Sequence, residues 1–369
     1  LLLKLYRVLE DGPNPDLEMG SFLGERGFPN VPLVLGSLEV RPRTGNLATL
    51  AMVQAFVPNE GNLWEATREA VVAFLHDVEA EGPPPEEGTE GNGSFLALSR
   101  REPSSQALRL MGTSLAMAGT LGERVGQMHV VLASADPSDP AFGPETLSQF
   151  HLRSMYQSIR RRVNGALDLL EARQSSLPVR DAQAAVRVLA AAPRVDALLI
   201  KLRDLHCDGQ RIRVHGDLHL GHVLDTGSDV VIIDFEGDSA RPLSERRLKR
   251  PALTDLASLV RSFHFAAHWP RVERELLGGY EIVPDGLAGW STFWFRWMSA
   301  ACISGYRKTT ERAAFQPSDD DAWSVLFTCL LVSRACDELT SRLGARSDWL
   351  GIPLAGLDEL LGGSDEPTV

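Results

Sequence analysis

The sequence predicts an α+β fold with two lobes, a small antiparallel β lobe followed by a larger, mostly helical lobe. Three runs of apolar and β-branched residues lie within residues 1–58, whereas long amphipathic stretches follow from about residue 63. A further observation is the block 211–236, in which two strand signals each end in an acidic loop. The 369 residues suffice for one two-lobed unit, or for two domains, with an ample core.

The first predicted strand carries a single cation, Lys4, within the apolar run LLLKLYRV. A helix is expected to begin at Asn14 and Pro15, because Asn is a favoured cap and Pro fits the first turn. Glu18 lies one turn into this helix and is expected to face back toward the sheet.

Two more strands, 31–40 and 47–57, complete the small lobe, which is predicted to cover residues 1–58. The second of them runs directly into the predicted hinge, at about residues 54–60. A helix is expected from about Leu63, at the start of the larger lobe.

The larger lobe, residues 61–369, is expected to be helical apart from an insertion at about residues 79–106. This insertion is rich in Pro, Gly, Glu and Ser, a composition typical of a mobile segment. No apolar run has the length to span a bilayer. Helices are expected over 114–135, two or three times within 144–205, over 254–268, and within 282–361, including a buried stretch at 323–332.

The net charge argues against one class of partner, and the cysteines indicate the compartment. The net charge of −12 at pH 7 argues against nucleic acid, whose phosphates attract basic proteins. The four cysteines show no paired spacing, and no secretory signal is visible, which together indicate reduced thiols in the cytoplasm. The chain begins at Leu1 inside a predicted strand, so we expect a fragment that lacks the first hairpin of the small lobe.

The block 211–236 contains the residues that predict a chemistry. The strand 211–214 leads into His215, Gly216 and Asp217, and after a turn at 225–228 the strand 230–233 leads into Asp234. Phosphoryl transfer in kinase-like folds needs two such carboxylates. Asp217 is the predicted catalytic base for the acceptor hydroxyl, and Asp234 the predicted ligand of the Mg²⁺ that accompanies ATP.

The small lobe offers the other parts of an ATP site. Kinase-like sites hold the phosphates with a strand lysine that pairs with a glutamate from the next helix. Lys4 and Glu18 are the predicted pair, and an edge lysine with a solvated glutamate is the alternative. The backbone of Gln54, Phe56 and Val57 is the predicted adenine contact.

Longer strings resemble the bacterial maltokinases, which belong to the aminoglycoside phosphotransferase and protein-kinase-like group. The string DFEG-x-x-x-RPL-x-ERR separates that family from protein kinases. The resemblance covers nearly the whole chain, is weakest in the insertion, and rests on LLLKLYRVLEDGPNPDLE, HGDLHLGHVL, VVIIDFEGDSARPLSERRLKRPALTDLASLVRSFHFAA and RSDWLGIPLAGL.

This resemblance implies transfer of the ATP γ-phosphate to maltose, giving maltose 1-phosphate for α-glucan and glycogen synthesis. It also implies Asp217 as base, Asp234 as magnesium ligand and Lys4 as the lysine that contacts the phosphates. The expected partners are a small sugar acceptor and, by fusion or in a complex, a trehalose synthase. An N-terminal cap subdomain is typical of the family and is expected to be missing here.

Several nearby residues have two open interpretations. His215 is expected to brace the catalytic loop through hydrogen bonds more than to act as a base. Glu236 either orients a sugar hydroxyl or a metal-bound water, or forms a salt bridge with Arg241 or Arg246. Asp255 and Arg261 are expected to brace the loop. The further candidates for substrate contacts are His219, Arg241, Asp337 and Trp349.

Two departures from the maltokinase pattern affect the metal and the acceptor. His222 stands where that pattern has glutamine, and imidazole suits Mn²⁺ or Zn²⁺ better than Mg²⁺. The trio His215, His219 and His222 also suggests a zinc site as a weaker alternative. Near residue 337, tyrosines of the pattern are replaced by small or acidic residues, and Asp337 would favour a cationic acceptor such as glucosamine.

A hypothesis of another class is a pseudokinase or regulatory domain that binds nucleotide without transferring phosphate. His222 and the expected missing N-terminus motivate it. The presence of Lys4, Glu18, Asp217 and Asp234 argues against it.

Overall fold

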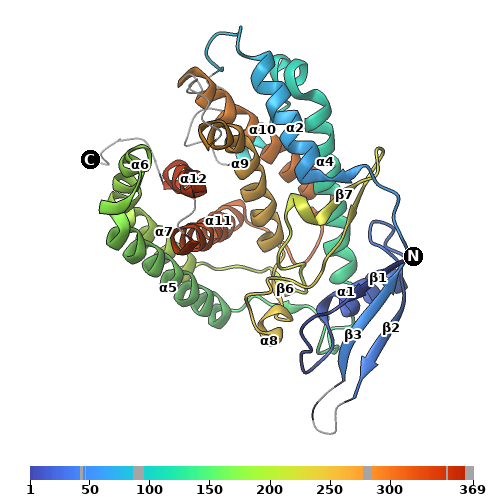
Figure 1. Cartoon of the computed structure of the whole chain (residues 1–369). Coiled ribbons are helices and arrows are strands. Elements are labelled where there is room, and N and C mark those ends of the chain that lie inside the picture. Colours follow the sequence, from blue (N-terminus) through green and yellow to red (C-terminus); the bar gives the residue numbers. More distant parts are fainter. Residues whose placement is uncertain (42–44, 46, 86–94, 277–284, 346–347, 362–369) are drawn as a thin grey trace.

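The computed structural model describes residues 1–41, 45, 47–85, 95–276, 285–345 and 348–361 (Figure 1). Helices dominate these residues, and the strands form three small sheets whose pairings are all antiparallel. The predicted α+β class with a helical majority is therefore confirmed.

The N-terminal sheet and helix α1 lie together at one end of the molecule (Figure 1). The strands pair in the order β1-β3-β2. Helix α1 begins as expected, with Pro15 in its first turn and the Asn14 side chain accepting the Asp16 N–H. The elements are β1 (Leu2–Leu5), α1 (Pro15–Glu25), β2 (Val34–Val40) and β3 (Ala48–Gln54).

Two further sheets hold the loops of the block 211–236. The predicted strands 211–214 and 230–233 fall in different sheets, as β6 and β8. The turn at 225–228 joins β8 to β7, a strand too short to give a pattern of alternating residues. The sheets are β4-β7-β8, of Gly61–Asn62, Val223–Asp225 and Val230–Ile232, and β5-β6-β9, of Glu145–Thr146, Gln210–Ile212 and Arg250–Pro251.

Most helices agree with the predicted regions, but the short helix α8 lies outside them and α4 and α9 extend beyond them. Helix α4 begins nine residues before the expected start at 114, because the Ser104 side chain caps it by accepting the Ala107 N–H. Part of the expected insertion 79–106 forms a short helix, α3, at Phe95–Leu98. Residues 86–94 of the insertion lie outside the described residues. The helices are α2 (Leu63–Asp77), α3 (Phe95–Leu98), α4 (Ser105–Leu132), α5 (Gln149–Arg173), α6 (Val179–Ala190), α7 (Ala192–Asp204), α8 (Leu243–Arg246), α9 (Leu253–Leu276), α10 (Asp285–Thr310), α11 (Asp320–Ala345) and α12 (Gly351–Leu361).

The helical core is built on the contact between α4 and α10. Glycine is required at Gly122, where a Cβ atom would lie 1.9 Å from the carbonyl oxygen of Cys302. A Cβ atom at Gly305 would likewise lie 2.1 Å from the carbonyl oxygen of Gly119. Three of the four cysteines, Cys302 among them, are buried free thiols. Among the described residues, no helix combines the length and apolarity needed to cross a bilayer.

Candidate active site

Asp217 and Asp234 lie on separate loops that His222 connects. Asp217 follows β6, Asp234 follows β8, and His222 ends the short 3₁₀ turn Leu220–His222. Nδ1 of His222 donates to the backbone carbonyl of Asp217 at 2.9 Å. This bond directs Nε2 toward Asp234, whose Oδ2 lies 3.2 Å away. One imidazole therefore fixes the spacing of the two predicted catalytic loops.

Asp234 sits at a strained turn. Its φ of 68° is the one positive value among the described residues other than glycine, and Gly237 follows at 71°. Such backbone conformations persist where surrounding contacts hold them, and they cluster at functional sites. Here Lys4 and His222 supply those contacts, from two sides of the carboxylate. The hydrogen bond from His222 and the neighbouring Lys4 hold the pKa of Asp234 well below its ordinary value.

Lys4 is surrounded by three carboxylates. Its Nζ lies 2.5 Å from Asp234, 2.6 Å from Asp16 and 3.1 Å from Glu236. Burial by itself lowers the pKa of Lys4, but Asp16 and Asp234 outweigh burial and raise it. Asp16 also accepts the Phe235 N–H at 2.9 Å. Asp16 therefore joins the strand lysine to the loop of Asp234.

The predicted pairing of Lys4 with Glu18 is wrong. Glu18 instead binds Arg213 at 2.8 Å and Arg247 at 2.6 Å. The reason is helical geometry, because two residues along a helix turn the side chain by roughly 200°. Asp16, in the first turn, faces Lys4, and Glu18 faces the arginines beyond β6.

Asp255 braces the loop that carries Asp217. Its carboxylate accepts the backbone N–H groups of His215 at 2.7 Å and Gly216 at 2.9 Å. It also lies 3.0 Å from Nε2 of His129 on α4. His215 is itself buried, with Nε2 2.9 Å from the Ile233 carbonyl oxygen, and burial lowers its pKa. These contacts match a bracing role for His215 better than a role as a base.

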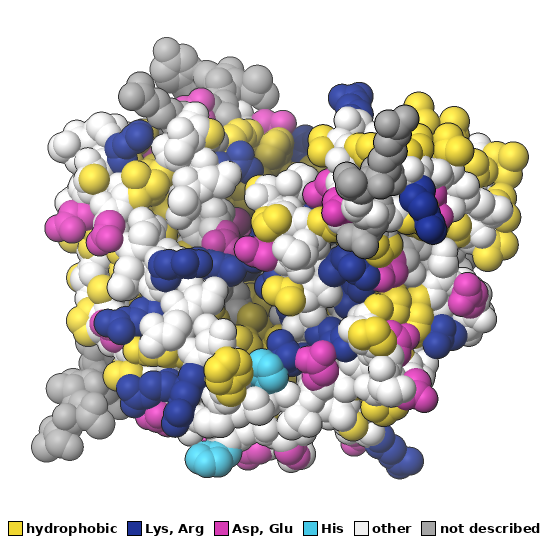
Figure 2. Space-filling view, turned by 90° about the horizontal axis from the view of Figure 1, so that it is seen from below, with side chains coloured by type: hydrophobic (Ala, Val, Ile, Leu, Met, Phe, Trp, Pro, Cys, Tyr) yellow, Lys and Arg dark blue, Asp and Glu magenta, His cyan; other side chains and the backbone are white. Residues whose placement is uncertain are grey.

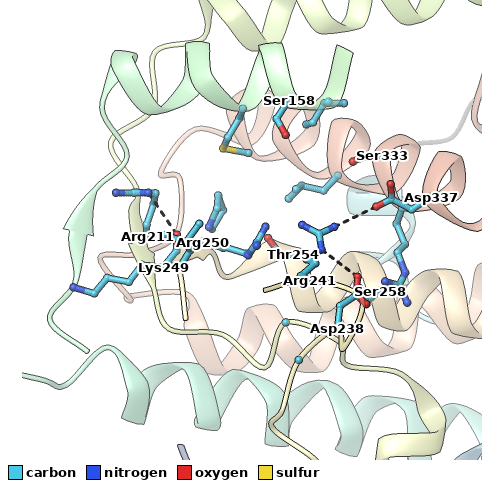
Figure 3. A pocket seen from close by; sticks show the side chains of 18 of the residues that line it. Ser158, Arg211, Asp238, Arg241, Lys249, Arg250, Thr254, Ser258, Ser333 and Asp337 are labelled. Carbon is cyan, nitrogen blue, oxygen red and sulfur yellow. Dashed lines mark hydrogen bonds and ion pairs between the residues drawn. The ribbon is translucent and has the colours of Figure 1, made fainter. Parts of the chain in front are cut away.

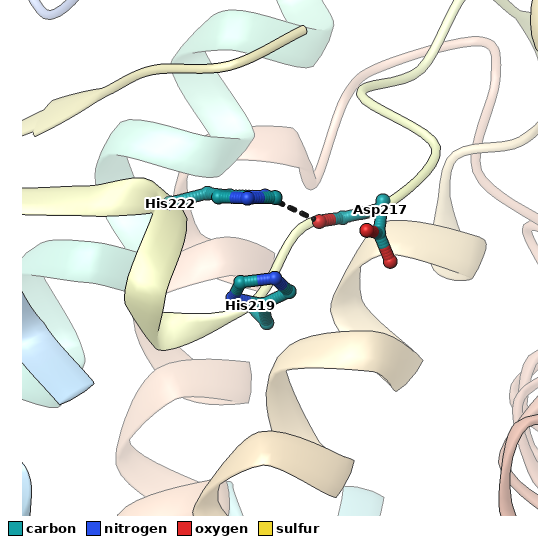
Figure 4. Close-up of side chains that lie close together, drawn as sticks. All are labelled: Asp217, His219 and His222. Carbon is teal, nitrogen blue, oxygen red and sulfur yellow. Dashed lines mark hydrogen bonds between the residues drawn. The ribbon is translucent and has the colours of Figure 1, made fainter. Parts of the chain in front are cut away.

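The histidine trio is only partly assembled. Asp217, His219 and His222 bring potential ligand atoms within 4.8 Å of one another, and the two imidazoles are stacked at 3.7 Å (Figure 4). His215 stays outside this group because its ring faces Ile233. Burial lowers the pKa of His219 to about 4.

Arg334 contacts the candidate base directly. Its Nη2 lies 3.1 Å from Oδ1 of Asp217, and Nε lies 3.8 Å from Glu338, one turn further along α11. Glu338 also accepts from Arg261 of α9 at 2.7 Å. Of the two residues expected to brace the loop, Arg261 thus binds Glu338, whereas Asp255 contacts the loop itself. No pattern in the sequence pointed to Arg334, because 117 residues separate it from Asp217.

A basic cavity of about 250 Å³ opens on one side of this loop. Figure 2 shows a hollow on the lower face with Lys and Arg side chains along its rim. Arg241 lies between Asp238 and Asp337, which it contacts at 3.1 and 3.6 Å (Figure 3). Asp337 also faces Arg162 at 3.5 Å, and burial raises its pKa. The cationic lining comprises Arg162, Arg211, Arg241, Arg246, Lys249, Arg250 and Arg334.

An aromatic cavity opens on the other side of the loop. Trp64, Phe265 and Trp269 line it together with His219, Arg334 and Glu338. Trp349 stacks on Trp269 with ring centroids 4.0 Å apart and so supports this wall from behind.

Glu236, Gln54 and Phe56, also predicted as site residues, lie in three different environments. The Glu236 side chain binds Lys4, and its backbone carbonyl, not its carboxylate, accepts from Arg246. Gln54 lines a narrow cavity together with Met52, Ile233 and Asp234. Phe56 is 59% exposed.

A model of the phosphotransferase enzyme family matches residues 57–290. A glucosamine kinase from Streptacidiphilus jiangxiensis is 24% identical over 251 residues, which are 68% of this chain and 50% of that protein. The chain thus spans half the length of this curated relative.

Solved structures agree on the fold. A glucosamine kinase in complex with glucosamine, ADP and inorganic phosphate has a TM-score of 0.68, with 21% identity over 97% of this chain and 71% of that one. A second crystal form of glucosamine kinase matches with the same TM-score and 20% identity, over 98% of this chain and 73% of that one.

Proposed function

The chain belongs to the phosphotransferase enzyme family, and on this premise we propose that it is an ATP-dependent sugar kinase. The observation that carries the proposal is the arrangement of Asp217 and Asp234 around His222, with Lys4 bound to Asp234. In the proposed reaction Asp217 takes the proton of the acceptor hydroxyl, the hydroxyl oxygen attacks the γ-phosphorus, and ADP leaves. Residues 1–58 would form the small lobe and residues 61–369 the larger one, joined by the hinge at 54–60.

The acids near Lys4 fit a divalent cation. Asp16, Asp234 and Glu236 offer carboxylate oxygens within 4.8 Å of one another, and oxygen is the ligand that Mg²⁺ prefers. Asp234 would hold the ion, which offsets the charge of the phosphates when bound. His222 adds a nitrogen donor beside Asp234, and Lys4, paired with Asp234 in this structure, would contact the phosphates.

For the acceptor, we propose glucosamine. The relatives described above, one by sequence and two by structure, are named glucosamine kinases. The aromatic cavity supports an amino sugar, because aromatic rings that can pack against a sugar ring line it together with a carboxylate, Glu338. This carboxylate is also bound by Arg261 and Arg334, and an ammonium group would share it with them. The basic cavity suits this acceptor less, since its excess of cations would repel an ammonium group.

Maltose is the second candidate acceptor. The string that begins at Asp234, DFEG followed by RPL and ERR, favours it through the resemblance to maltokinases. A role in glycogen synthesis and an association with a trehalose synthase belong to this second proposal.

The test is a panel of acceptors with ADP release as the readout. Glucosamine, N-acetylglucosamine, glucose, maltose and an aminoglycoside would be compared at equal concentrations, and the phosphorylated position would be read by NMR. We expect the highest kcat/KM for glucosamine and a large loss on N-acetylation, which removes the positive charge. Preference for maltose would select the second candidate, and ADP release from none would favour a nucleotide-binding pseudokinase.

Asp217→Asn is the matched control for this assay. We expect at least a ~100-fold loss of kcat, the usual cost of removing a general base, with nucleotide binding unchanged. Retention of more than about a tenth of the activity would remove Asp217 from the role of base.

A further inference from the structure

Two histidines of α9 and one glutamate of α12 converge away from the catalytic loops. His264 and His268 are one helical turn apart, so both rings project from the same face of α9. Nε2 of His264 lies 3.5 Å from Oε2 of Glu359, and Nε2 of His268 lies 3.5 Å from Oε1. The ligand atoms of the three side chains all lie within 4.8 Å of one another.

Three of the four imidazole nitrogens of this cluster lack hydrogen-bond partners. Both ring nitrogens of His264 and Nε2 of His268 are buried, and none of the three makes a hydrogen bond. The His264 side chain is 1% exposed, and that of His268 is 10% exposed. Buried polar atoms without a partner are rare in native proteins, and a bound ion or water is a common explanation.

The spacing fits a shared ion better than direct hydrogen bonds. A separation of 3.5 Å exceeds the usual N–H···O distance of about 2.9 Å. Two ligands placed at about 2.1 Å from one tetrahedral ion lie roughly 3.4 Å apart. The two imidazole-to-carboxylate distances therefore match two edges of a metal coordination sphere.

We propose that His264, His268 and Glu359 form a binding site for a divalent first-row transition metal, with Zn²⁺ as the best match. Two imidazoles and one carboxylate favour such ions over Mg²⁺ or Ca²⁺, which prefer oxygen ligands. The Glu359 side chain is 30% exposed, which leaves space for a water molecule as fourth ligand. This proposal is independent of the proposed sugar kinase activity.

The surroundings support a cation at this position. Thr292 of α10 lies 3.3 Å from Oε1 of Glu359 and can hold the carboxylate in place. Arg261, one turn before His264, places a positive charge near that imidazole. Its charge is balanced by Glu338, 2.7 Å away.

The site would connect α12 to the wall of the aromatic cavity. Phe265 and Trp269 line that cavity and immediately follow His264 and His268 along α9. An ion shared with Glu359 would fix this part of α9 against α12, so the proposed role is structural. Removal of the metal should therefore lower thermal stability more than the turnover number.

The test measures the zinc content of a variant that lacks the proposed metal ligands of the active site. The full chain, free of any histidine tag and carrying Asp234→Ala and His222→Gln, would be stripped with a chelator, equilibrated with Zn²⁺ and dialysed. We expect one zinc per chain by elemental analysis, and X-ray absorption should show two imidazoles with oxygen donors. His264→Gln or Glu359→Gln should weaken Zn²⁺ binding by at least roughly 100-fold, and His76→Gln, at an exposed histidine of α2, should not.

Two results would overturn the proposal. One is a zinc content near zero in this background after equilibration. The other is equal zinc binding by the His264→Gln and His76→Gln proteins. If the histidine variants do not fold, Glu359→Gln and the absorption spectrum of the parent decide, because a bound zinc without imidazole neighbours would lie elsewhere.

Discussion

At the scale of single residues, Asp16 is the side chain on which the candidate nucleotide site depends most. One of its oxygens binds Lys4 at 2.6 Å and the other accepts the Phe235 N–H at 2.9 Å. It is 4% exposed, so its geometry is held by packing as well as by these bonds. Asp16 therefore holds both the side chain of Lys4 and the loop of Asp234 in position. The left-handed backbone at Asp234 needs such support from its surroundings.

Replacing Asp16 by Asn should impair catalysis while keeping the fold. The amide is nearly isosteric but loses the charge that holds Lys4, so we expect roughly a 10- to 100-fold loss of kcat/KM for ATP. Glu18→Gln is the control on the same helix and should keep kcat within about threefold, since Glu18 contacts Arg213 and Arg247. Steady-state kinetics of both variants give the comparison. If both variants lost the same amount of activity, Asp16 would have no specific role in catalysis, and α1 would affect activity only by stabilising the fold.

His222 should influence which metal supports activity. Its Nε2 lies 3.2 Å from Asp234, so the ring is placed to share the ion with that carboxylate. Nitrogen donors favour Mn²⁺ over strongly hydrated Mg²⁺. His222→Gln should therefore lower the ratio of activity with Mn²⁺ to activity with Mg²⁺ at saturating ion. His219→Gln, at the imidazole that stacks on His222, is the control, and a ratio unchanged by His222→Gln would place His222 outside the metal site.

Part of the site follows from the sequence and part does not. Asp217, Asp234 and His222 fall within 18 residues on loops after strand signals, so their proximity was predictable. Arg334 and Glu338 come from a helix more than 100 residues later, and only the packing of α11 brings them to the loop. The choice of Asp16 over Glu18 depended on the helix phase, which shifts with the first residue of the helix.

At the scale of elements, Glu18 links α1 to the rest of the chain through two arginines. Burial by itself raises the pKa of Glu18, but the hydrogen bonds from Arg247 and Arg213 outweigh burial and lower it. Its side chain is 13% exposed, so this bridge is largely shielded from solvent. Breaking a buried ion pair by removing one partner typically costs about 3 to 5 kcal/mol.

This bridge predicts a pH-dependent contribution to stability. Because the folded pKa of Glu18 is depressed, its stabilisation is present above the unfolded value of about 4.3 and is lost as pH falls through the folded pKa. Glu18→Gln should lower the free energy of unfolding by about 3 kcal/mol at pH 7, and the difference should shrink below about pH 4. Denaturant titrations of both proteins from pH 3 to 7 would measure it. A difference that does not change with pH would exclude the ion pair as the cause.

Long elements could be predicted from the sequence, whereas the shortest strands could not. Long amphipathic stretches gave the helices α5 to α7 and α9 to α12 correctly as regions, because a repeat near 3.6 residues accumulates over several turns. Strands of two or three residues, such as β7 and β9, carry no such repeat, so the assignment of β6 and β8 to separate sheets could not be foreseen. The early start of α4 depended on one cap, Ser104.

At the scale of the whole molecule, contacts from the N-terminal sheet and α1 converge on the loops around Asp234. Lys4 and Asp16 reach the loop after β8, and Asn30 bonds to Val230 within β8. On the proposed division at residues 54–60, these contacts cross from one lobe to the other. The narrow cavity lined by Gln54, Met52 and Asp234 lies along the same boundary. A ligand bound there would contact both lobes and stabilise the chain as a unit.

Nucleotide binding at this boundary should therefore raise the melting temperature in a way that depends on Asp234. A ligand that binds only the folded state at 100 times its Kd adds about 2.7 kcal/mol. We expect ATP with Mg²⁺ to raise Tm by several degrees in the parent, and by much less in Asp234→Ala, because that variant loses the predicted metal ligand. Arg250→Ala, in the basic cavity, should keep the full shift. The opposite pattern, a shift lost in Arg250→Ala and kept in Asp234→Ala, would place the phosphates among the arginines of the basic cavity and reverse the assignment of the two sites.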